Sequence, residues 1–172
     1  KIAFFVAEEV GCKGSSMCDM SFFGDCRFVI QCDRRGGGDF IETACGTELC
    51  SEDFINDSGM EYFGYKEATG VMTDVYQLKL NGLKVSCVNL SCGYYNPHQD
   101  EEYTIISELE NCLSFVENII ESCQNVYPHE CNFKYSKYGT GTLTKGKYSD
   151  PYDDYSYYRD YDGLPYYDRY EE

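Results

Sequence analysis

Short apolar runs recur along the chain up to about residue 91 and are separated by polar or glycine-containing segments. Runs of this length that are rich in Val, Ile, Phe and Tyr are typical of β-strands. On this pattern the predicted strands cover residues 2–7, 27–32, 39–43, 65–69 and 84–91. The first of them is expected to be a buried strand that runs directly into two carboxylates.

Helical periodicity appears between and after these runs. A helix from about residue 51 is predicted by Ser51, a good N-cap residue, followed by the acidic Glu52 and Asp53. Shorter helical segments are predicted near 14–22 and 74–81. The clearest helix covers residues 104–124, where apolar residues recur at spacings of three and four: Ile105, Ile106, Leu109, Leu113, Val116, Ile119 and Ile120.

The alternation of strands and helices predicts an α/β fold. We expect a mostly parallel sheet flanked by helices on both faces, in three layers (αβα). This domain is expected to cover residues 1–133. Beyond it, residues 134–172 are rich in Tyr and Asp and poor in aliphatic residues, and they hold 11 of the 18 tyrosines. They are predicted to be a low-complexity tail, either a disordered appendage or a segment that binds a partner or assembles copies of the chain.

Charge and hydropathy exclude two classes of partner. The net charge of −16 argues against nucleic acid, because affinity for a phosphate backbone comes from Lys and Arg. No apolar stretch is long enough for a membrane span, and residues 1–7 are too short for a signal peptide. A cytoplasmic protein is therefore expected, with a targeting signal upstream of residue 1 left open.

The eleven cysteines allow two interpretations. Their number is odd, and several lie inside predicted strands and helices, where free Cys behaves as a small apolar residue. Reduced thiols in an intracellular compartment are the favoured interpretation, while a secreted protein with several disulfides is the alternative.

Ionisable residues follow three of the predicted strands. Glu8 and Glu9 come after strand 2–7, Asp33 follows strand 27–32, and His98 follows strand 84–91. Because the carboxyl ends of neighbouring strands meet at one edge of an open α/β sheet, these side chains are expected to converge.

Carboxylate oxygens and an imidazole nitrogen suit zinc, cobalt or manganese, and a second carboxylate can take a proton from metal-bound water. The alternatives are an exposed acidic pair before a helix and a turn histidine bonded to a nearby carboxylate.

The order of these motifs resembles the co-catalytic, two-metal zinc metallopeptidase superfamily of the leucyl aminopeptidases, peptidase T and aminoacylases, and phage-encoded peptidases of that group in particular. The resemblance covers about residues 1–125. The motifs that carry it are Glu8-Glu9-Val10-Gly11, Asp33, Thr73-Asp74 and His98.

The resemblance implies a role for each of these positions. Glu8 resembles the general base, Glu9 a ligand of one metal ion and Asp33 a ligand of the other. His98 resembles the partner of Glu9, and Thr73-Asp74 resembles the pair on the substrate side. A complete site of this kind holds two ions, zinc or else cobalt or manganese, and acts on a peptide substrate.

The chain also departs from the superfamily. Members supply a His-x-Asp motif and a metal-bridging Asp from an N-terminal half, whereas this sequence opens on Lys1 in a predicted strand. We expect a fragment of a longer polypeptide or one product of a split gene whose partner chain supplies the rest. A remnant domain kept for binding is the third explanation.

The predicted function is metal-dependent, exopeptidase-type hydrolysis of peptide bonds, or the C-terminal half of such an enzyme. The alternative is a non-catalytic structural or assembly protein on a degenerate peptidase scaffold. In that case the Tyr-rich tail would mediate interaction, for example in a homo-oligomer.

Overall fold

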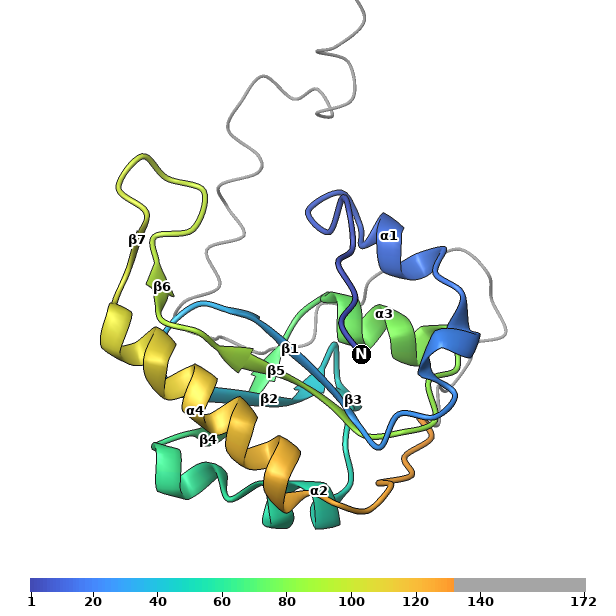
Figure 1. The fold of residues 1–172 in the computed structure, drawn as a ribbon. Coiled ribbons are helices and arrows are strands. Elements are labelled where there is room, and N and C mark those ends of the chain that lie inside the picture. The colour runs from blue at the N-terminus through green and yellow to red at the C-terminus, as the bar shows by residue number, and fades with distance from the viewer. Residues whose placement is uncertain (132–172) are drawn as a thin grey trace, which may run out of the picture. The chain divides into compact units, whose positions relative to one another are not determined.

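A mixed β-sheet forms the centre of the computed structural model, which describes residues 1–131 (Figure 1). The strand order is β1-β5-β2-β3, and β4 also pairs with β2. The strands are β1 Val29–Arg34, β2 Asp39–Ala44, β3 Thr47–Glu48, β4 Lys66–Gly70 and β5 Cys87–Ser91. The predicted tail, residues 134–172, lies outside the described residues.

Parallel and antiparallel pairings both occur in this sheet. β1 pairs with β5 and β2 pairs with β4 in parallel, whereas β2 is antiparallel to both β3 and β5. The predicted α/β class is confirmed. The predicted mostly parallel sheet is found in part, because β2 continues into the short β3 through a hairpin turn and runs against β5.

Helices connect and follow the strands. The α-helices are α1 Lys13–Ser16, α2 Glu52–Ser58, α3 Asp74–Leu80 and α4 Ile106–Ser122, and short 3-10 helices cover η1 Met20–Phe23 and η2 Met60–Phe63. The N-terminus of α2 forms as predicted, because the Ser51 hydroxyl oxygen accepts a hydrogen bond from the Phe54 backbone N–H at 3.3 Å. None of the helices between residues 1 and 131 has the length and apolar character needed to cross a membrane.

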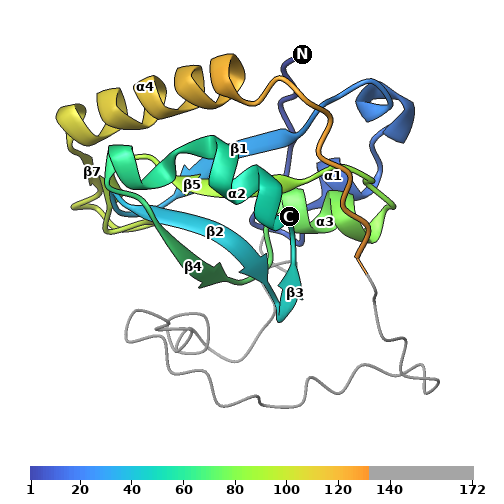
Figure 2. The same ribbon diagram turned by 90° about the horizontal axis from the view of Figure 1, so that it is seen from below.

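Two hydrophobic clusters pack against the sheet. Figures 1 and 2 show the helices that surround it. The first cluster joins α2, η2 and α4 to the strands, and its fully buried members include Phe40, Phe54, Leu90, Phe115 and Ile119. The second joins α3 and η1 to the strands, and its buried members include Phe23, Ala44, Val75, Leu78 and Cys87. All eleven cysteines are free thiols.

The side chains of β1 and β5 alternate between these two clusters, as the period of two along a strand requires. Ile30, Val88 and Leu90 belong to the cluster with α4, whereas Val29 and Cys87 belong to the cluster with α3. On the α3 side both strands become polar toward their carboxyl ends. Because β1 and β5 are parallel neighbours, these polar ends lie at the same edge of the sheet.

The predicted strand at 2–7 is wrong. This segment has no regular structure, and Ile2, Phe4 and Val6 are 79%, 92% and 74% exposed. The chain turns at Ala7, whose φ is 55°, and the Val6 carbonyl then accepts a hydrogen bond from the Gly14 N–H at 3.0 Å. The segment therefore closes a loop instead of pairing with β1, although one of its side chains, Phe5, packs against the α3 cluster.

Candidate functional site

Two amide side chains tie the carboxyl ends of β1 and β5 to the start of α3. Gln31 and Asn89 are register neighbours in the parallel β1–β5 pair. Gln31 Oε1 accepts hydrogen bonds from Thr73 Oγ1 at 2.8 Å and from the Val75 N–H at 2.9 Å. Asn89 Nδ2 donates to Thr73 Oγ1 at 3.1 Å. The network fixes the first turn of α3 against the sheet edge at which carboxylates were predicted to converge.

Asp33 lies at the end of this network. The Gln31 and Asn89 amides both donate hydrogen bonds to its carboxylate. Burial raises the pKa of Asp33, and these two hydrogen bonds act in the opposite direction because they stabilise the charged form. Asp33 is therefore a carboxylate whose oxygens are oriented by two fixed amide donors.

Glu8 lies in the loop that precedes α1 and faces the same edge. Burial is the largest of the causes that together raise its pKa from 4.5 to about 7. The remaining causes that raise it are the negative charges of Glu9, Asp33 and Asp74. A carboxyl group with a pKa near neutral pH exchanges a proton readily under physiological conditions, which is the property required of a general base or acid.

The loop that carries Glu8 is tightly closed. The Cys12 N–H donates to the Glu8 carbonyl at 2.8 Å. A Cβ atom at Gly14 would lie 2.6 Å from the Val6 nitrogen and 2.7 Å from its carbonyl oxygen. A side chain at position 14 would thus force the loop open, so glycine is required here by close backbone approach.

His98 reaches the site from the loop between β6 Tyr94–Tyr95 and β7 Tyr103–Thr104, which lies at the same end of the molecule as the loop before α1 (Figure 1). Its Nε2 is 3.4 Å from Glu9 Oε1, and the two side chains are 54% and 64% exposed. The loop is supported by the stacked rings of Tyr95 and Tyr103, whose centroids are 5.3 Å apart. The imidazole and carboxylate thus face each other at an accessible position.

Backbone strain concentrates in the same two loops. Five non-glycine residues among residues 1–131 have a positive φ, and four of them flank or include the predicted site residues: Ala7, Cys12, Asn96 and His98. Left-handed backbone is sparsely populated by residues other than glycine, and such positions cluster at functional sites. This distribution supports a functional role for the edge formed by the two loops.

Thr73 and Asp74, the predicted substrate-side pair, lie beneath this edge. They are 6% and 8% exposed. The Thr73 hydroxyl is part of the amide network, and Asp74 accepts a hydrogen bond from the Ser15 hydroxyl. In this structure the pair positions α3 and the α1 loop relative to the sheet, and neither side chain is open to solvent.

The side chains at this edge provide part of the ligand set that a metal ion needs. Glu9 and His98 offer one carboxylate oxygen and one imidazole nitrogen, both of which zinc, cobalt and manganese accept. Within the described part of the chain, no group of three or more His, Cys, Asp and Glu side chains is arranged to hold a metal ion. The Asp33 carboxylate accepts hydrogen bonds from two amides and does not form a group of three ligands with Glu9 and His98. The described residues therefore fit two ligands of a site, not a complete one.

Gln31, Asn89 and Ser15 belong to this site but were not predicted from the sequence. The sequence holds a signal for two of them: each is a polar residue that directly follows apolar residues in a strand, Gln31 after Ile30 in β1 and Asn89 after Val88 in β5. Asn89 is buried and Gln31 partly buried, and polar residues so placed in a strand need hydrogen-bond partners, which marks the place where a sheet face becomes polar. Ser15 offered no comparable signal.

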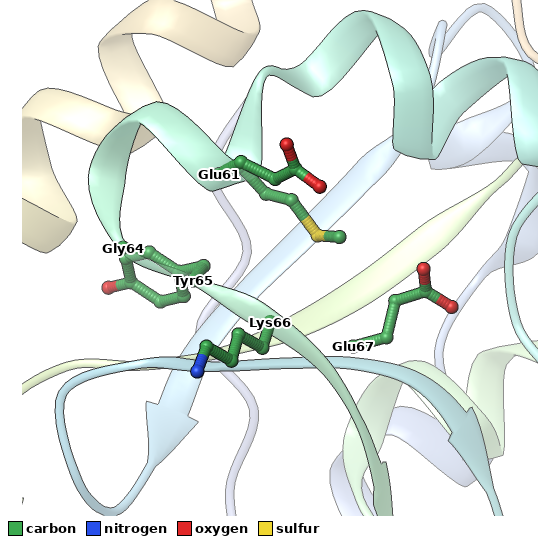
Figure 3. A pocket seen from close by; sticks show the side chains of 6 residues that line it. Glu61, Gly64, Tyr65, Lys66 and Glu67 are labelled. Atoms are coloured by element: carbon green, nitrogen blue, oxygen red, sulfur yellow. The ribbon is translucent and has the colours of Figure 1, made fainter.

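Two surface cavities lie away from this edge. One, of about 430 Å³, is lined by residues of η2 and β4, among them Glu61, Tyr65, Lys66 and Glu67 (Figure 3). The other, of about 510 Å³, is lined by Ser51, by residues of α2 and by residues 125–128. Neither cavity is lined by the carboxylates or the histidine of the candidate site.

No protein-family model, curated protein or solved structure matches the chain.

Proposed function

We propose that this chain carries part of the catalytic site of a metal-dependent hydrolase that cleaves peptide bonds in the manner of an exopeptidase, on a three-layer αβα scaffold. The observation that carries the proposal is the position of Glu8. Its carboxyl group, with a pKa of about 7, lies at the same sheet edge as the Glu9–His98 pair and Asp33. The two clusters that pack against the sheet support the layered scaffold.

Each residue has a defined task in this proposal. Glu8 takes a proton from the attacking water and passes it to the leaving amine. Glu9 and His98 hold an ion, and Asp33, oriented by Gln31 and Asn89, offers a further carboxylate at the edge. Zinc, cobalt or manganese, when bound, supplies an acidic water and polarises the peptide carbonyl.

The remaining ligands are proposed to come from an N-terminal segment or a partner chain. The proposal rests on the donor count, since residues 1–131 provide a pair of ligands at Glu9 and His98 but no group of three. A full two-metal site also needs a bridging carboxylate. The chain by itself is therefore expected to hydrolyse peptides slowly, at a rate that is low but measurable.

Hydrolysis of leucine p-nitroanilide and of dipeptides by the full chain with Mn²⁺, Co²⁺ or Zn²⁺ tests the proposal. Glu8→Gln is expected to lower the metal-dependent rate by a factor of about 10² or more, because it removes the general base and keeps the shape of the side chain. Glu61→Gln, an exposed position in η2, is the matched control and should retain the rate. Equal turnover with and without Glu8, or turnover that survives chelation of the metal, would contradict the proposal.

A further inference from the structure

The last helix, α4, presents two apolar surfaces, and the fold fully buries only one of them. Cys112, Phe115 and Ile119 are at most 3% exposed and belong to the first core cluster. A second row lies beside them and is formed by Ile106, Leu109, Leu113, Val116 and Ile120, hereafter the α4 stripe. The buried row is sufficient to pack α4 on the sheet, so this packing does not explain why the residues of the stripe are apolar.

Most of the stripe is open to solvent. Ile106 is 62% exposed, Leu109 44%, Leu113 59% and Ile120 48%, while Val116 is partly buried against the core. Single exposed apolar residues are ordinary on protein surfaces. A continuous row of exposed apolar residues along one helix is unusual, and such patches mark interaction sites.

The spacing of the stripe is that of a helix–helix seam. Its members are separated by three, four, three and four residues, the a and d positions of a heptad repeat. At 1.5 Å per residue the 14 steps from Ile106 to Ile120 span about 21 Å, or four helical turns. A partner helix with the same spacing would insert its side chains between those of the stripe.

The solvent side of the stripe is acidic. Glu110, Glu117 and Glu121 are exposed and lie on the border opposite the buried row, as the helical period of 3.6 places them. α4 contains no Lys or Arg. A helix that docks on the stripe therefore meets a row of negative charges along one flank.

The negative charges beside the stripe determine which kind of helix can dock on it. A second copy of the chain would bring another acidic flank to a contact only one helix wide, and like charges across a seam destabilise it. A stable dimer also buries roughly 800 Å² on each partner, which calls for more than one narrow stripe. Charge complementarity favours a partner whose helix has basic flanks.

We propose that the α4 stripe docks an amphipathic helix of a partner protein that has apolar residues at heptad spacing and Lys or Arg along its flanks. This role is independent of the hydrolytic proposal, because no residue of the stripe belongs to the Glu8, Glu9, Asp33 and His98 edge.

The probe is a synthetic helical peptide of about three heptads with Leu at the a and d positions and Lys at the flanking positions. Titrated into the full chain and followed by fluorescence anisotropy, it is expected to bind with a Kd on the order of 10 µM and to bind more weakly as salt rises. A scrambled peptide of the same composition controls for attraction to the acidic chain as a whole. It should bind at least tenfold more weakly.

Variants locate the contact. Leu113→Glu should weaken binding at least tenfold without lowering the melting temperature, whereas Leu80→Glu, at a 42% exposed leucine on α3, should leave binding unchanged. The double variant Glu110→Lys, Glu117→Lys should lose the Lys-flanked peptide and gain a Glu-flanked one. This charge reversal tests the proposal even if Leu113→Glu proves unstable.

Three results would overturn the proposal. The first is equal binding of the designed and scrambled peptides, which includes absence of binding by both. The second is an affinity that neither variant changes. The third is a dimer of the unmodified chain, detected by sedimentation and dissociated by Leu113→Glu, which would assign the stripe to a second copy.

Discussion

At the scale of single residues, Glu8 distinguishes a reactive site from an ordinary acidic surface. An exposed glutamate keeps its usual pKa, whereas burial and the charges of Glu9, Asp33 and Asp74 raise that of Glu8 to about 7. Three carboxylates placed around a fourth, half-buried one oppose its ionisation and so cost stability. An arrangement that costs stability is characteristic of functional sites.

The raised pKa of Glu8 predicts a pH-dependent stability. Since the pKa in the folded chain, about 7, lies above the ordinary value of 4.5, the folded chain binds this proton more tightly than the unfolded chain. The free energy of unfolding should therefore fall as the pH rises from about 4.5 to about 7. Glu8→Gln should stabilise the chain at pH 8 by about 1 to 2 kcal/mol, after a discount for solvent screening, and change little at pH 4. Urea unfolding at the two pH values measures both effects.

Glu52→Gln is the control for this experiment, because Glu52 is exposed in the first turn of α2. It should show no gain at pH 8. A Glu8→Gln chain that is less stable than the unmodified chain at pH 8 would mean that the ionised Glu8 makes favourable contacts, and the assignment of a raised pKa would be wrong.

The sequence was informative about charged residues and uninformative about the amides between them. Glu9 and His98 were predicted as partners and lie 3.4 Å apart, and Asp33 lies at the predicted edge. Charged residues after apolar runs are visible in a sequence because the contrast in polarity is large. The amides Gln31 and Asn89 matter through contacts across the sheet, and these depend on strand register.

At the scale of elements, composition predicted most strands and helices but failed at the N-terminus. The run of residues 2–7 has the apolar character of a strand, yet strand formation requires a neighbour with free backbone groups. β1 is an edge strand that pairs only with β5 among the described residues, so it could have offered such a neighbour. The N-terminal segment turns back at Ala7 instead, and the Val6 and Ala7 carbonyls accept hydrogen bonds from the Gly14 and Lys13 N–H groups. The α4 periodicity was predicted correctly, but the sequence alone did not show which of its two apolar rows would be buried.

The difference in burial between the N-terminal segment and the strands of the sheet predicts unequal effects of similar substitutions. Phe4 is 92% exposed, so Phe4→Ser should change the free energy of unfolding by no more than about 0.5 kcal/mol. Phe40, on β2, is fully buried in the first cluster, so Phe40→Ala should cost about 3 to 5 kcal/mol. Denaturant unfolding at one pH compares them. A cost above about 2 kcal/mol for Phe4→Ser would indicate that the segment is buried in solution after all.

At the scale of the whole molecule, the two proposed roles use different surfaces. The edge proposed for hydrolysis is formed by the loops before α1 and between β6 and β7, whereas the α4 stripe lies on the helix that covers the first cluster. The alternative of an assembly protein that acts through residues 134–172 remains a prediction, because that segment is outside the described residues.

Removal of residues 134–172 tests that alternative. Every member of the two core clusters lies at or before Tyr127, so the shortened chain should melt within about 2 °C of the full chain. Its elution volume in size-exclusion chromatography, corrected for mass, should show the same association state. Dissociation of an oligomer on truncation would instead favour assembly through the tail over catalysis.

Metal binding by the Glu9–His98 pair is the central claim, and titration of the full chain with Mn²⁺, followed by electron paramagnetic resonance, tests it most directly. Mn²⁺ is the suitable ion because it prefers oxygen and nitrogen ligands, while the thiols of the eleven cysteines would compete for zinc. One ion per chain should bind, with affinity reduced at least tenfold by Glu9→Gln and by His98→Ala and retained in Glu8→Gln. Two results would contradict the account. One is Mn²⁺ binding that neither the Glu9 nor the His98 variant weakens. The other is no binding at about 1 mM Mn²⁺, a concentration at which a site with a Kd of about 1 mM is half occupied.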